Sequence, residues 1–537
     1  MPHPILPMQS KQFVLWPAPP TPNGRLHLGH MAGPYMRMDA LARYLRSVGH
    51  QAAILIVSDM FDSYVLWKAH QEGLSPQEVC RHYHEQIRGD FEALDIDVEV
   101  FLCLAEGETA RQHATRTRSA VEQLVASGRT TTRVERVMYC PSTERYLVGV
   151  WLQGKCPVCE AEAGGYFCER CGALFRPETM LDPRPRLGDS PIEWREVETL
   201  FVRLDRDIDQ YSSRAGAPPQ FAKSVERYIA TQGPFFPLTA PGTWGVDWTA
   251  DRFGNPRVLF EAGWELAATC GAVYAEQSGH GINPFRRDSS ITTVTSFGID
   301  NSLCLLCGTP AVMSTLNDWK PFDFTLANFF YTLEGEKFST SRGHAIWTID
   351  IIAKTPATSD AVRFFLAREN PEKQPTNFSV QQFVHCVNDV LVGKVQKAAF
   401  GALRTLGDLT VQPASGELNA LLRQFLCEQD QAFSFGSLSL ARIPRLVESW
   451  VDEVPGAVFV DPSEAHLWLK GLALLAAPLM PRFASRLWSA LGHSGDPVRS
   501  ELHTVRTPCG WRGKAPFEPL SVESLAPCLP KHLVLAR

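Results

Sequence analysis

The stretch "PNGRLHLGH", from Pro22 to His30, decides the fold because an apolar run precedes it and a helical pattern follows it. The apolar run is Phe13 to Trp16, and the pattern predicts a helix from His27 onward that ends at Gly49. The next run, Ala52 to Val57, is continuously apolar, which is typical of a buried parallel strand. The beginning of the chain therefore predicts a strand–helix–strand unit.

The composition is that of an ordinary globular protein. The chain has 537 residues, of which 45% are hydrophobic and 20% charged, and its net charge is −6. This charge argues against non-specific coating of nucleic acid but leaves room for a local basic groove. The sequence shows neither a membrane span nor a secretory signal, so we expect a cytoplasmic protein. Its 14 cysteines do not suggest a disulfide framework.

A second α/β region follows an insertion, and a helical region ends the chain. The runs "RVLF", "SITTVTSFGI" and "LCLLCG" are predicted as strands of the second region, so the whole predicts a split Rossmann-type nucleotide fold. A 3.6-residue period predicts a helical bundle near the end. The predicted domains are 1–115 (first half of the nucleotide fold), 116–230 (insertion, with a cysteine knuckle at about 140–180), 231–320 (second half), 321–378 (loop and stem region), 379–505 (helical bundle) and 506–537 (tail).

His27 and His30 stand at the predicted start of a helix, directly after a strand and a turn. Helix N-termini attract phosphates, and two histidines three residues apart share one side of the first turn. They can donate hydrogen bonds to phosphate oxygens as negative charge develops there. Gly29 leaves room for an adenine ring near the backbone. The alternative is two surface histidines at a helix cap, and the preceding strand and turn favour the phosphate site.

The knuckle contains two CxxC pairs that predict a metal site. Cys156, Cys159, Cys168 and Cys171 offer four thiolates with tetrahedral spacing, the set that structural zinc prefers. The alternative is four free cysteines. Cys140 has no CxxC partner, so we expect one zinc ion with no role in chemistry.

Several motifs together resemble one family. The segment from His27 to His30 looks like the HIGH motif of class I aminoacyl-tRNA synthetases, and "PNGRLHLGH" is most similar to methionyl-tRNA synthetases. "GDFEALDI", the cysteine knuckle, "FGID", "GEKFSTSRG" and "FVHCVNDVLVGKV" follow in that family's order over nearly the whole chain. The resemblance implies a class I synthetase fold, and ATP-dependent activation of an amino acid as its adenylate with Mg²⁺.

The resemblance also implies site residues. His27, His30 and Lys337 would be catalytic, stabilising the phosphates, and Asp59 would bind the α-ammonium group of the substrate. The residues implied to bind ATP are Asn23, Gly29, Gly298, Asp300, Ser339 and Ser341. Those implied to line the side-chain pocket are Pro19, Thr21, Leu266 and Leu305.

The sequence departs from the family in three places. In the loop "KFSTS", Thr340 replaces the second lysine of KMSKS. The candidate substitute cation is Arg342, His344 or another basic residue, and the alternative is a complete loss of activation. In the pocket, the four positions just named differ from the family's residues. In the helical domain, "VDEVPGAV" lacks the family's base-stacking tryptophan, although Trp450 lies nearby.

These departures favour a specialised paralogue. The first hypothesis is a monomeric ATP-dependent ligase that adenylates an amino acid other than methionine and transfers it to a small-molecule nucleophile. Methionyl-tRNA-synthetase-like proteins of natural-product pathways, such as the synthetase-like part of hydrazine synthetases, resemble this arrangement, and a separate cupin-type partner would supply any further step. The alternatives are an authentic methionine–tRNA ligase with tRNA as acceptor, and a non-catalytic RNA-binding protein.

Overall fold

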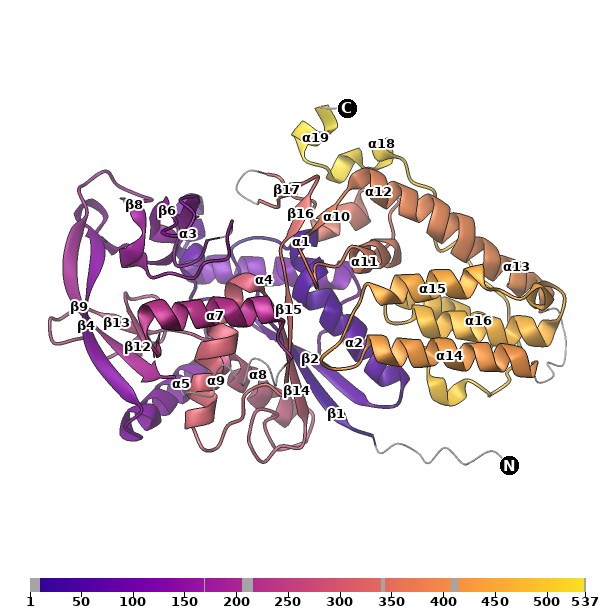
Figure 1. Ribbon diagram of the computed structural model, residues 1–537, viewed down its shortest axis with the longest axis horizontal. Coiled ribbons are helices and arrows are strands. Elements are labelled where there is room, and N and C mark those ends of the chain that lie inside the picture. Colours follow the sequence, from indigo (N-terminus) through magenta and orange to yellow (C-terminus); the bar gives the residue numbers. More distant parts are fainter. Residues whose placement is uncertain (1–9, 169, 205–215, 340–342, 407–413, 536–537) are drawn as a thin grey trace.

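A parallel sheet forms the centre of the protein. The computed structural model describes residues 10–168, 170–204, 216–339, 343–406 and 414–535. Five strands pair in the order β15-β14-β1-β2-β3 (Figure 1). Their bounds are β1 Gln12–Pro17, β2 Gln51–Val57, β3 Val100–Leu102, β14 Thr292–Gly298 and β15 Phe324–Asn328. From β1 the chain adds β2 and β3 on one side of the sheet and later β14 and β15 on the other. Ligands are therefore expected at the carboxyl ends of β1 and β14, where the strand order switches sides.

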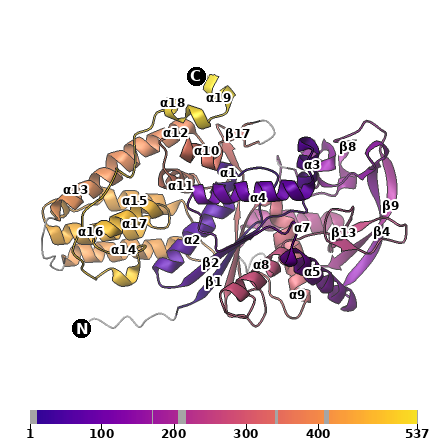
Figure 2. The ribbon, with the colours of Figure 1, turned by 180° about the vertical axis from the view of Figure 1, so that it is seen from behind.

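The strands are apolar throughout because both faces of the sheet are covered. In β1, Phe13 and Leu15 join one hydrophobic core, whereas Val14 and Trp16 join the other. Helix α2 (Met36–Ser47) packs in the first core and α8 (Trp264–Gln277) in the second, on either side of β1 and β2 (Figure 2). This two-sided burial confirms the predicted Rossmann-type fold.

The insertion between β3 and β14 extends to one side of the sheet. Two long antiparallel strands, β4 (Thr130–Cys140) and β9 (Glu193–Arg203), carry it away from the sheet. The knuckle is a small sheet of β6 (Leu152–Lys155), β7 (Glu162–Gly164) and β8 (Leu181–Pro185). The helices next to or within the insertion are α3 Ser63–Glu72, α4 Pro76–Ala93, α5 Glu108–Ala126 and α7 Pro219–Gln232.

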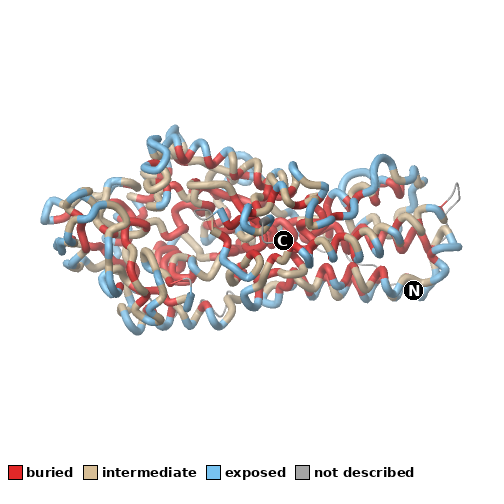
Figure 3. The backbone as a smooth tube through the Cα atoms, turned by 90° about the horizontal axis from the view of Figure 1, so that it is seen from above, coloured by how far each residue is buried: buried red, intermediate tan, exposed pale blue. Residues whose placement is uncertain are grey.

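Helices form the opposite end of the elongated molecule (Figure 3). Helix α16 (Pro462–Ala476) is the central one, and every residue from Glu464 to Ala476 is buried. Its neighbours are α13 Lys397–Thr405, α14 Gly416–Ala432, α15 Arg442–Asp452 and α17 Pro481–Ala490. The helix entering this region is α12 Val380–His385, continued by the π-helical η7 Cys386–Gln396. The predicted helical region is therefore confirmed.

The remaining elements connect the sheet to the helical end. They are β16 Tyr331–Leu333, β17 Glu336–Lys337, β18 Thr376–Phe378, α10 Thr348–Ala353 and α11 Ser359–Arg368. The tail carries two short helices, α18 (Val522–Leu525) and α19 (Lys531–Leu535), and packs Phe517 and Leu525 into the core. None of the described helices is long and apolar enough to cross a bilayer.

Two of the predicted strands were wrong in type or place. "LCLLCG" is the helical turn η6 (Cys304–Gly308), which continues into α9 (Thr309–Thr315), because a short buried apolar run fits a helix as well as a strand. "RVLF" contains β13 (Arg257–Leu259), but this strand pairs antiparallel with β11 (Thr239–Pro241) and β12 (Asp247–Trp248) outside the main sheet. The fifth strand of the main sheet is instead β15, beyond residue 320.

Candidate active site

His27 and His30 form a reciprocal pair at the start of α1 (Leu28–His30). The Nδ1 of His27 accepts a hydrogen bond from the His30 backbone N–H, and the Nδ1 of His30 accepts one from the His27 N–H, each over 3.3 Å. The rings stack with their centroids 3.7 Å apart. Because both Nδ1 atoms accept, each ring carries its proton on Nε2, which is then a donor suited to a phosphate oxygen.

Both imidazoles are held neutral. Desolvation, then the neighbouring His30 and Lys337, lowers the pKa of His27 well below its usual value. Desolvation and then Lys337 lower the pKa of His30 in the same direction. Lys337 ends β17 and directly precedes Phe338, whose ring stacks on His27, so the lysine belongs to the loop that packs on the two neutral donors.

Gly29 is needed for a contact that the sequence did not indicate. A Cβ at this position would lie 2.8 Å from the Phe338 ring and 3.1 Å from the His27 ring. Phe338 stacks on His27 with ring centroids 4.6 Å apart. The loop that carries Lys337 is thus packed directly on the histidine pair, which explains how a residue some 300 positions later reaches it.

Gly298 and Asp300 lie together at the carboxyl end of β14. A Cβ on Gly298 would approach the Asp300 carboxylate to 2.6 Å, so glycine is what allows this carboxylate to fold back over the strand end. Asn23 lies in the turn before the histidines, where its N–H donates to the Thr21 carbonyl. These positions agree with a ribose site at the switch point of the sheet, and their roles stay predictions.

Asp59 follows β2 at the same edge of the sheet, and its N–H donates to the Pro20 carbonyl over 3.0 Å. Desolvation, then Asp62 and Glu261, raises the pKa of its carboxyl well above the usual value. Asp62 caps α3 by accepting from the Tyr64 N–H. The site thus contains a group of neighbouring carboxylates, of which the sequence predicted Asp59 alone.

The four predicted pocket residues are divided between a loop and the core. Pro19 and Thr21 are half-buried in the loop after β1. Leu266 and Leu305 are buried in the same hydrophobic core, at 3% and 2% exposure. Leu305 lies against Gly263, 3.1 Å from where a Cβ would stand, and beside Trp16. This leaves an apolar wall at the start of α8.

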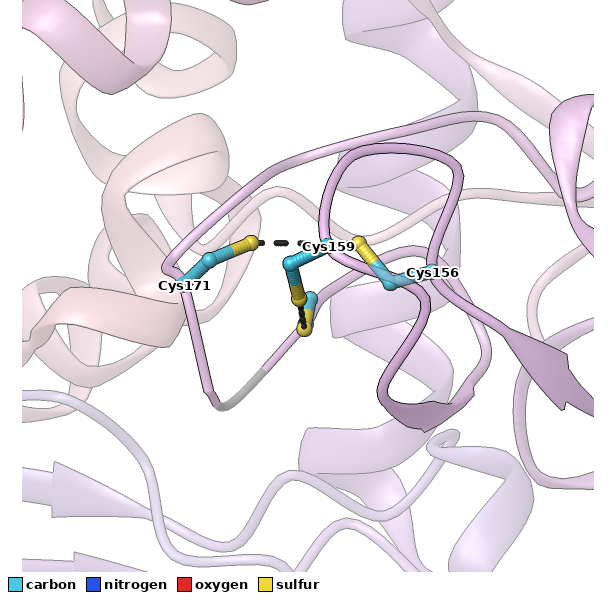
Figure 4. A group of neighbouring side chains, drawn as sticks. Cys156, Cys159 and Cys171 are labelled. Atoms are coloured by element: carbon cyan, nitrogen blue, oxygen red, sulfur yellow. Dashed lines mark hydrogen bonds between the residues drawn. The ribbon is translucent and has the colours of Figure 1, made fainter.

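The four knuckle cysteines converge as a zinc site requires (Figure 4). The sulfurs of Cys156 and Cys171 are 3.8 Å apart, and those of Cys159 and Cys168 are 3.6 Å apart. A tetrahedron with Zn–S bonds of about 2.3 Å has an edge of about 3.8 Å. Each CxxC turn closes on a residue of positive φ, at Glu160 and Gly172. The cluster fits structural zinc, which here would brace the knuckle and do no chemistry.

The knuckle lies over the sheet edge. Phe167 packs near Phe330, with ring centroids 6.1 Å apart, and Gly172 faces Ile299 directly after Gly298. Desolvation, followed by Cys304 and the carboxylates of Asp62 and Asp59, raises the pKa of the Tyr166 phenol, next to Phe167 in the same turn. Zinc binding and the active site are therefore connected through one short segment.

His344 is not the substitute cation. Its ring is 3% exposed, its Nε2 bonds to the Leu333 carbonyl over 2.9 Å, and its Nδ1 bonds to His532 of the tail over 2.9 Å. With both nitrogens bonded inside the protein, the ring cannot also bind a phosphate. Of the other loop residues, Ser339 forms an isolated antiparallel bridge with His344. Thr340, Ser341 and Arg342 lie outside the described residues.

Trp450 is likewise unavailable to RNA. It is fully buried between α15 and α16, donates to the Trp468 carbonyl over 3.2 Å and stacks on the Trp468 ring. The suggestion that it replaces the missing base-stacking residue is therefore wrong, because a core position removes the ring from solvent. The exposed aromatic residue of this region is Phe459, at 41% exposure.

Sequence reasoning gave no role to the residues that complete the site, which are Phe338 at the phosphate end and Asp62, Glu261, Glu265 and His113 at the amino-acid end. The one available signal was "FEAGWELAA", in which two acids four residues apart begin a helix. Such acids are usually read as a helix N-terminal pair, and burial cannot be seen in the letters.

Comparison with known proteins agrees with this geometry. The sequence profile of the family described as tRNA synthetases class I (M) matches residues 15–400. The chain belongs to this family. As a class I synthetase relative, it is an ATP-dependent ligase of the type that forms an aminoacyl adenylate.

Two relatives and one solved structure define the similarity. The methionine–tRNA ligase of Thermoplasma acidophilum is 26% identical over 94% of this chain and 97% of the relative. That of Salinibacter ruber is 29% identical over 72% of this chain and 56% of the relative. The Mycobacterium tuberculosis methionyl-tRNA synthetase bound by methionyl-adenylate superposes with a TM-score of 0.71 at 18% identity, over 95% of this chain and 100% of that one. This last likeness shows the fold alone.

Proposed function

We propose that this chain adenylates an amino acid other than methionine with ATP and transfers the acyl group to a small-molecule nucleophile. The observation that carries the proposal is that the loop bearing Lys337 packs on two Nε2–H donors, with Asp59 and Asp300 at the same edge of the sheet. These groups can bind an α-amino acid and a nucleoside triphosphate so that the carboxylate of the first faces the phosphates of the second.

In the first step, a carboxylate oxygen of the amino acid attacks the α-phosphorus of ATP. The new O–P bond forms as the bond to pyrophosphate breaks, and the leaving oxygen keeps the electron pair. His27 and His30 donate from Nε2 to the phosphate oxygens, and Lys337 balances their charge. Asp59 holds the α-ammonium group and so orients the carboxylate.

In the second step, a nucleophile attacks the activated carbonyl carbon, and AMP leaves with the electron pair of the C–O bond. Mg²⁺ neutralises charge on the phosphates of ATP when bound. Among the described residues, the cysteine cluster is the single group of His, Cys, Asp and Glu close enough to hold a metal, so Mg²⁺ is expected to arrive on ATP.

The choice of a substrate other than methionine rests on the pocket. Pro19, Thr21, Leu266 and Leu305 differ from the residues that the resemblance implies at these positions. In addition, buried carboxylates adjoin the apolar wall. A thioether side chain would leave these carboxylates without a partner, which is unfavourable in a desolvated pocket.

The choice of a small-molecule acceptor rests on the helical end. "VDEVPGAV" contains no aromatic residue, Trp450 is buried, and the next residue, Phe459, packs one edge of its partly exposed ring against Gly401. A base-stacking contact is worth about 1–3 kcal/mol, so its loss weakens anticodon recognition. The proposal keeps four further predictions: action in the cytoplasm, a monomeric chain, a role like that of the synthetase-like part of hydrazine synthetases, and a separate cupin-type partner.

A second candidate is methionine–tRNA ligation. It is favoured by the two relatives named methionine–tRNA ligases, one of which is matched over 97% of its length. A non-catalytic RNA-binding protein is the third candidate, and the intact histidine pair counts against it.

ATP–pyrophosphate exchange over the twenty amino acids, with and without tRNA, separates the three. The proposal expects exchange without tRNA for an amino acid other than methionine, and no charging of tRNA with methionine. Strong methionine charging would establish the second candidate. Absence of exchange with every amino acid, under conditions where the protein is folded, would favour the third.

A further inference from the structure

Four carboxyl groups lie near one another at the amino-acid end of the site: Asp59, Asp62, Glu261 and Glu265, which we name the carboxylate cluster. The two aspartates follow β2, and the two glutamates flank the start of α8. Desolvation raises the pKa of Glu261 to about 8, and desolvation, then Glu261, raises that of Glu265 well above its usual value. Helix α8 packs on the end of β2, where the Cys270 thiol donates to the Ile56 carbonyl over 3.4 Å, and Asp59 also raises the pKa of Glu265, so the two pairs of acids lie in one region.

The two glutamates each have one satisfied oxygen and one without a partner. Oε1 of Glu265 accepts from the Ala262 N–H over 2.6 Å, and Oε1 of Glu261 bonds to His113 Nε2 over 2.7 Å. Oε2 of each is buried and has no hydrogen-bond partner. Glu265 is 1% exposed, and the Glu261 side chain is 6% exposed. A buried carboxylate oxygen without a partner indicates a position that a ligand fills.

Among the described residues, no cationic side chain bonds to these two oxygens. Desolvation and then Arg116 lower the pKa of His113 to about 3, so this ring is neutral. Arg116 donates to the Thr269 hydroxyl, and no described ion pair joins it to either glutamate. Desolvation, then Asp59 and Glu265, raises the pKa of the neighbouring Cys304 thiol to about 12, so this side chain is neutral and adds no charge to the region.

The cluster is not arranged as a metal site. Within the described parts of the chain, only the four cysteines form a group of three or more residues whose ligand atoms could hold one metal ion. The carboxylates are thus spread along a wall instead of converging on a point. Next to them, Leu305 and Trp16 line the start of α8 with apolar surface. This combination suits a chain of methylene groups that ends in a positive charge.

We propose that the amino acid activated here carries a second cationic group on its side chain, as in the lysine and ornithine class. Asp59 binds the α-ammonium group, and the free oxygens of Glu265 and Glu261 receive the side-chain ammonium group. Leu305 and Trp16 contact the methylene groups between them. This inference rests on the proposed function, since it names the substrate class of the same site.

Equilibrium dialysis against labelled lysine, ornithine, norleucine and methionine tests the pocket without requiring catalysis. Norleucine is the matched ligand, because it has the length of lysine without the ammonium group. We expect lysine or ornithine to bind at least about 30-fold more tightly than norleucine, the loss typical of removing one partner of a buried charge pair. Equal or tighter binding of norleucine or methionine would overturn the inference.

Variants locate the effect. Glu265→Gln keeps the shape of the side chain and should reduce the preference for lysine over norleucine at least about tenfold, and Glu261→Gln should act in the same direction. Glu276→Gln, at an exposed position of the same helix, is the control and should change nothing. A lysine preference that survives both variants would also overturn the inference. The wild-type comparison decides the question even if a variant does not fold.

The exchange assay keeps the two proposals apart. If exchange occurs only with uncharged amino acids, adenylation stands and the second cation is wrong. If lysine binds with the expected preference but no amino acid supports exchange, the pocket assignment stands and the proposed adenylation fails.

Discussion

The two ends of the candidate site differ. At the phosphate end, His27 and His30 lie on one side of the first helical turn, as their spacing predicts, and Phe338 fixes the lysine-bearing loop on them. At the amino-acid end, Leu266 and Leu305 stand beside two buried glutamates, each with one side-chain oxygen that has no hydrogen-bond partner. The difference teaches that the reaction and the substrate are specified separately: the first end determines adenylation, and the second determines what is adenylated.

The largest effect should follow from removing a donor at the phosphate end. His27→Ala deletes one Nε2–H and the stacking partner of Phe338, so exchange should fall by about 10²- to 10³-fold in kcat, as for loss of an oxyanion donor. Pyrophosphate exchange with the best amino acid measures this. His82→Ala, exposed on α4, is the control. A loss below tenfold would contradict the comparison, because the phosphate end would then not perform the chemistry.

The second effect should come from restoring the missing lysine. Thr340→Lys adds a cation to the loop, and we expect exchange to rise about 10- to 100-fold if charge on pyrophosphate limits the step. The control is Thr249→Lys, at an exposed loop position. Thr358 is not used as a control site because its side chain caps α11. An unchanged rate would mean that the altered loop is already complete for its substrate.

The third effect is a pH shift at the amino-acid end. Asp59 must be ionised to bind an ammonium group, and the neighbouring Asp62 charge raises its pKa. Asp62→Asn removes that charge, lowers the pKa of Asp59 and moves the acid limb of kcat/KM for the amino acid to lower pH by about one unit. On that limb the variant should be about tenfold more active than wild type.

Asparagine also caps helices, so α3 should be unaffected. Asp288→Asn, at an exposed position, should leave the profile in place. A shift toward higher pH would contradict the sign of the interaction, and would mean that Asp59 does not hold the α-ammonium group.

The smallest effect on chemistry should come from the knuckle. Cys156→Ser removes one of four thiolates, so bound zinc should fall from one per chain to well below one, and the thermal midpoint should fall. Exchange should decline less than with His27→Ala, since the ion braces the knuckle without touching the reacting atoms. Metal analysis and thermal unfolding measure this, with Cys427→Ser, exposed on α14, as control. Full zinc content in Cys156→Ser would rule out the four-cysteine site.

The sequence predicted the phosphate end better than the amino-acid end for physical reasons. The histidine pair depends on neighbours within four residues, and the zinc site on two local turns, so spacing alone determines both. The chemistry of Glu265, in contrast, depends on its burial where α8 packs against the end of β2. This contact joins distant parts of the chain, so the residues around Glu265 do not predict it. His344 is bonded to His532, 188 residues away, and could not be recognised as occupied from its loop.

The fold shows the same division. β1 and β2 were predictable because strands buried on both faces are continuously apolar. "LCLLCG" has an equally apolar run yet is helical, because it packs as a turn beside α9, and run length does not separate the two structures. β15 was missed because its five residues contain two polar ones.

Pyrophosphate exchange across the twenty amino acids, without tRNA or acceptor and in parallel for wild type and His27→Ala, tests the central claim most directly. The account predicts exchange for at least one amino acid other than methionine, lost in the variant. Exchange restricted to methionine, or exchange that survives without His27, would contradict it.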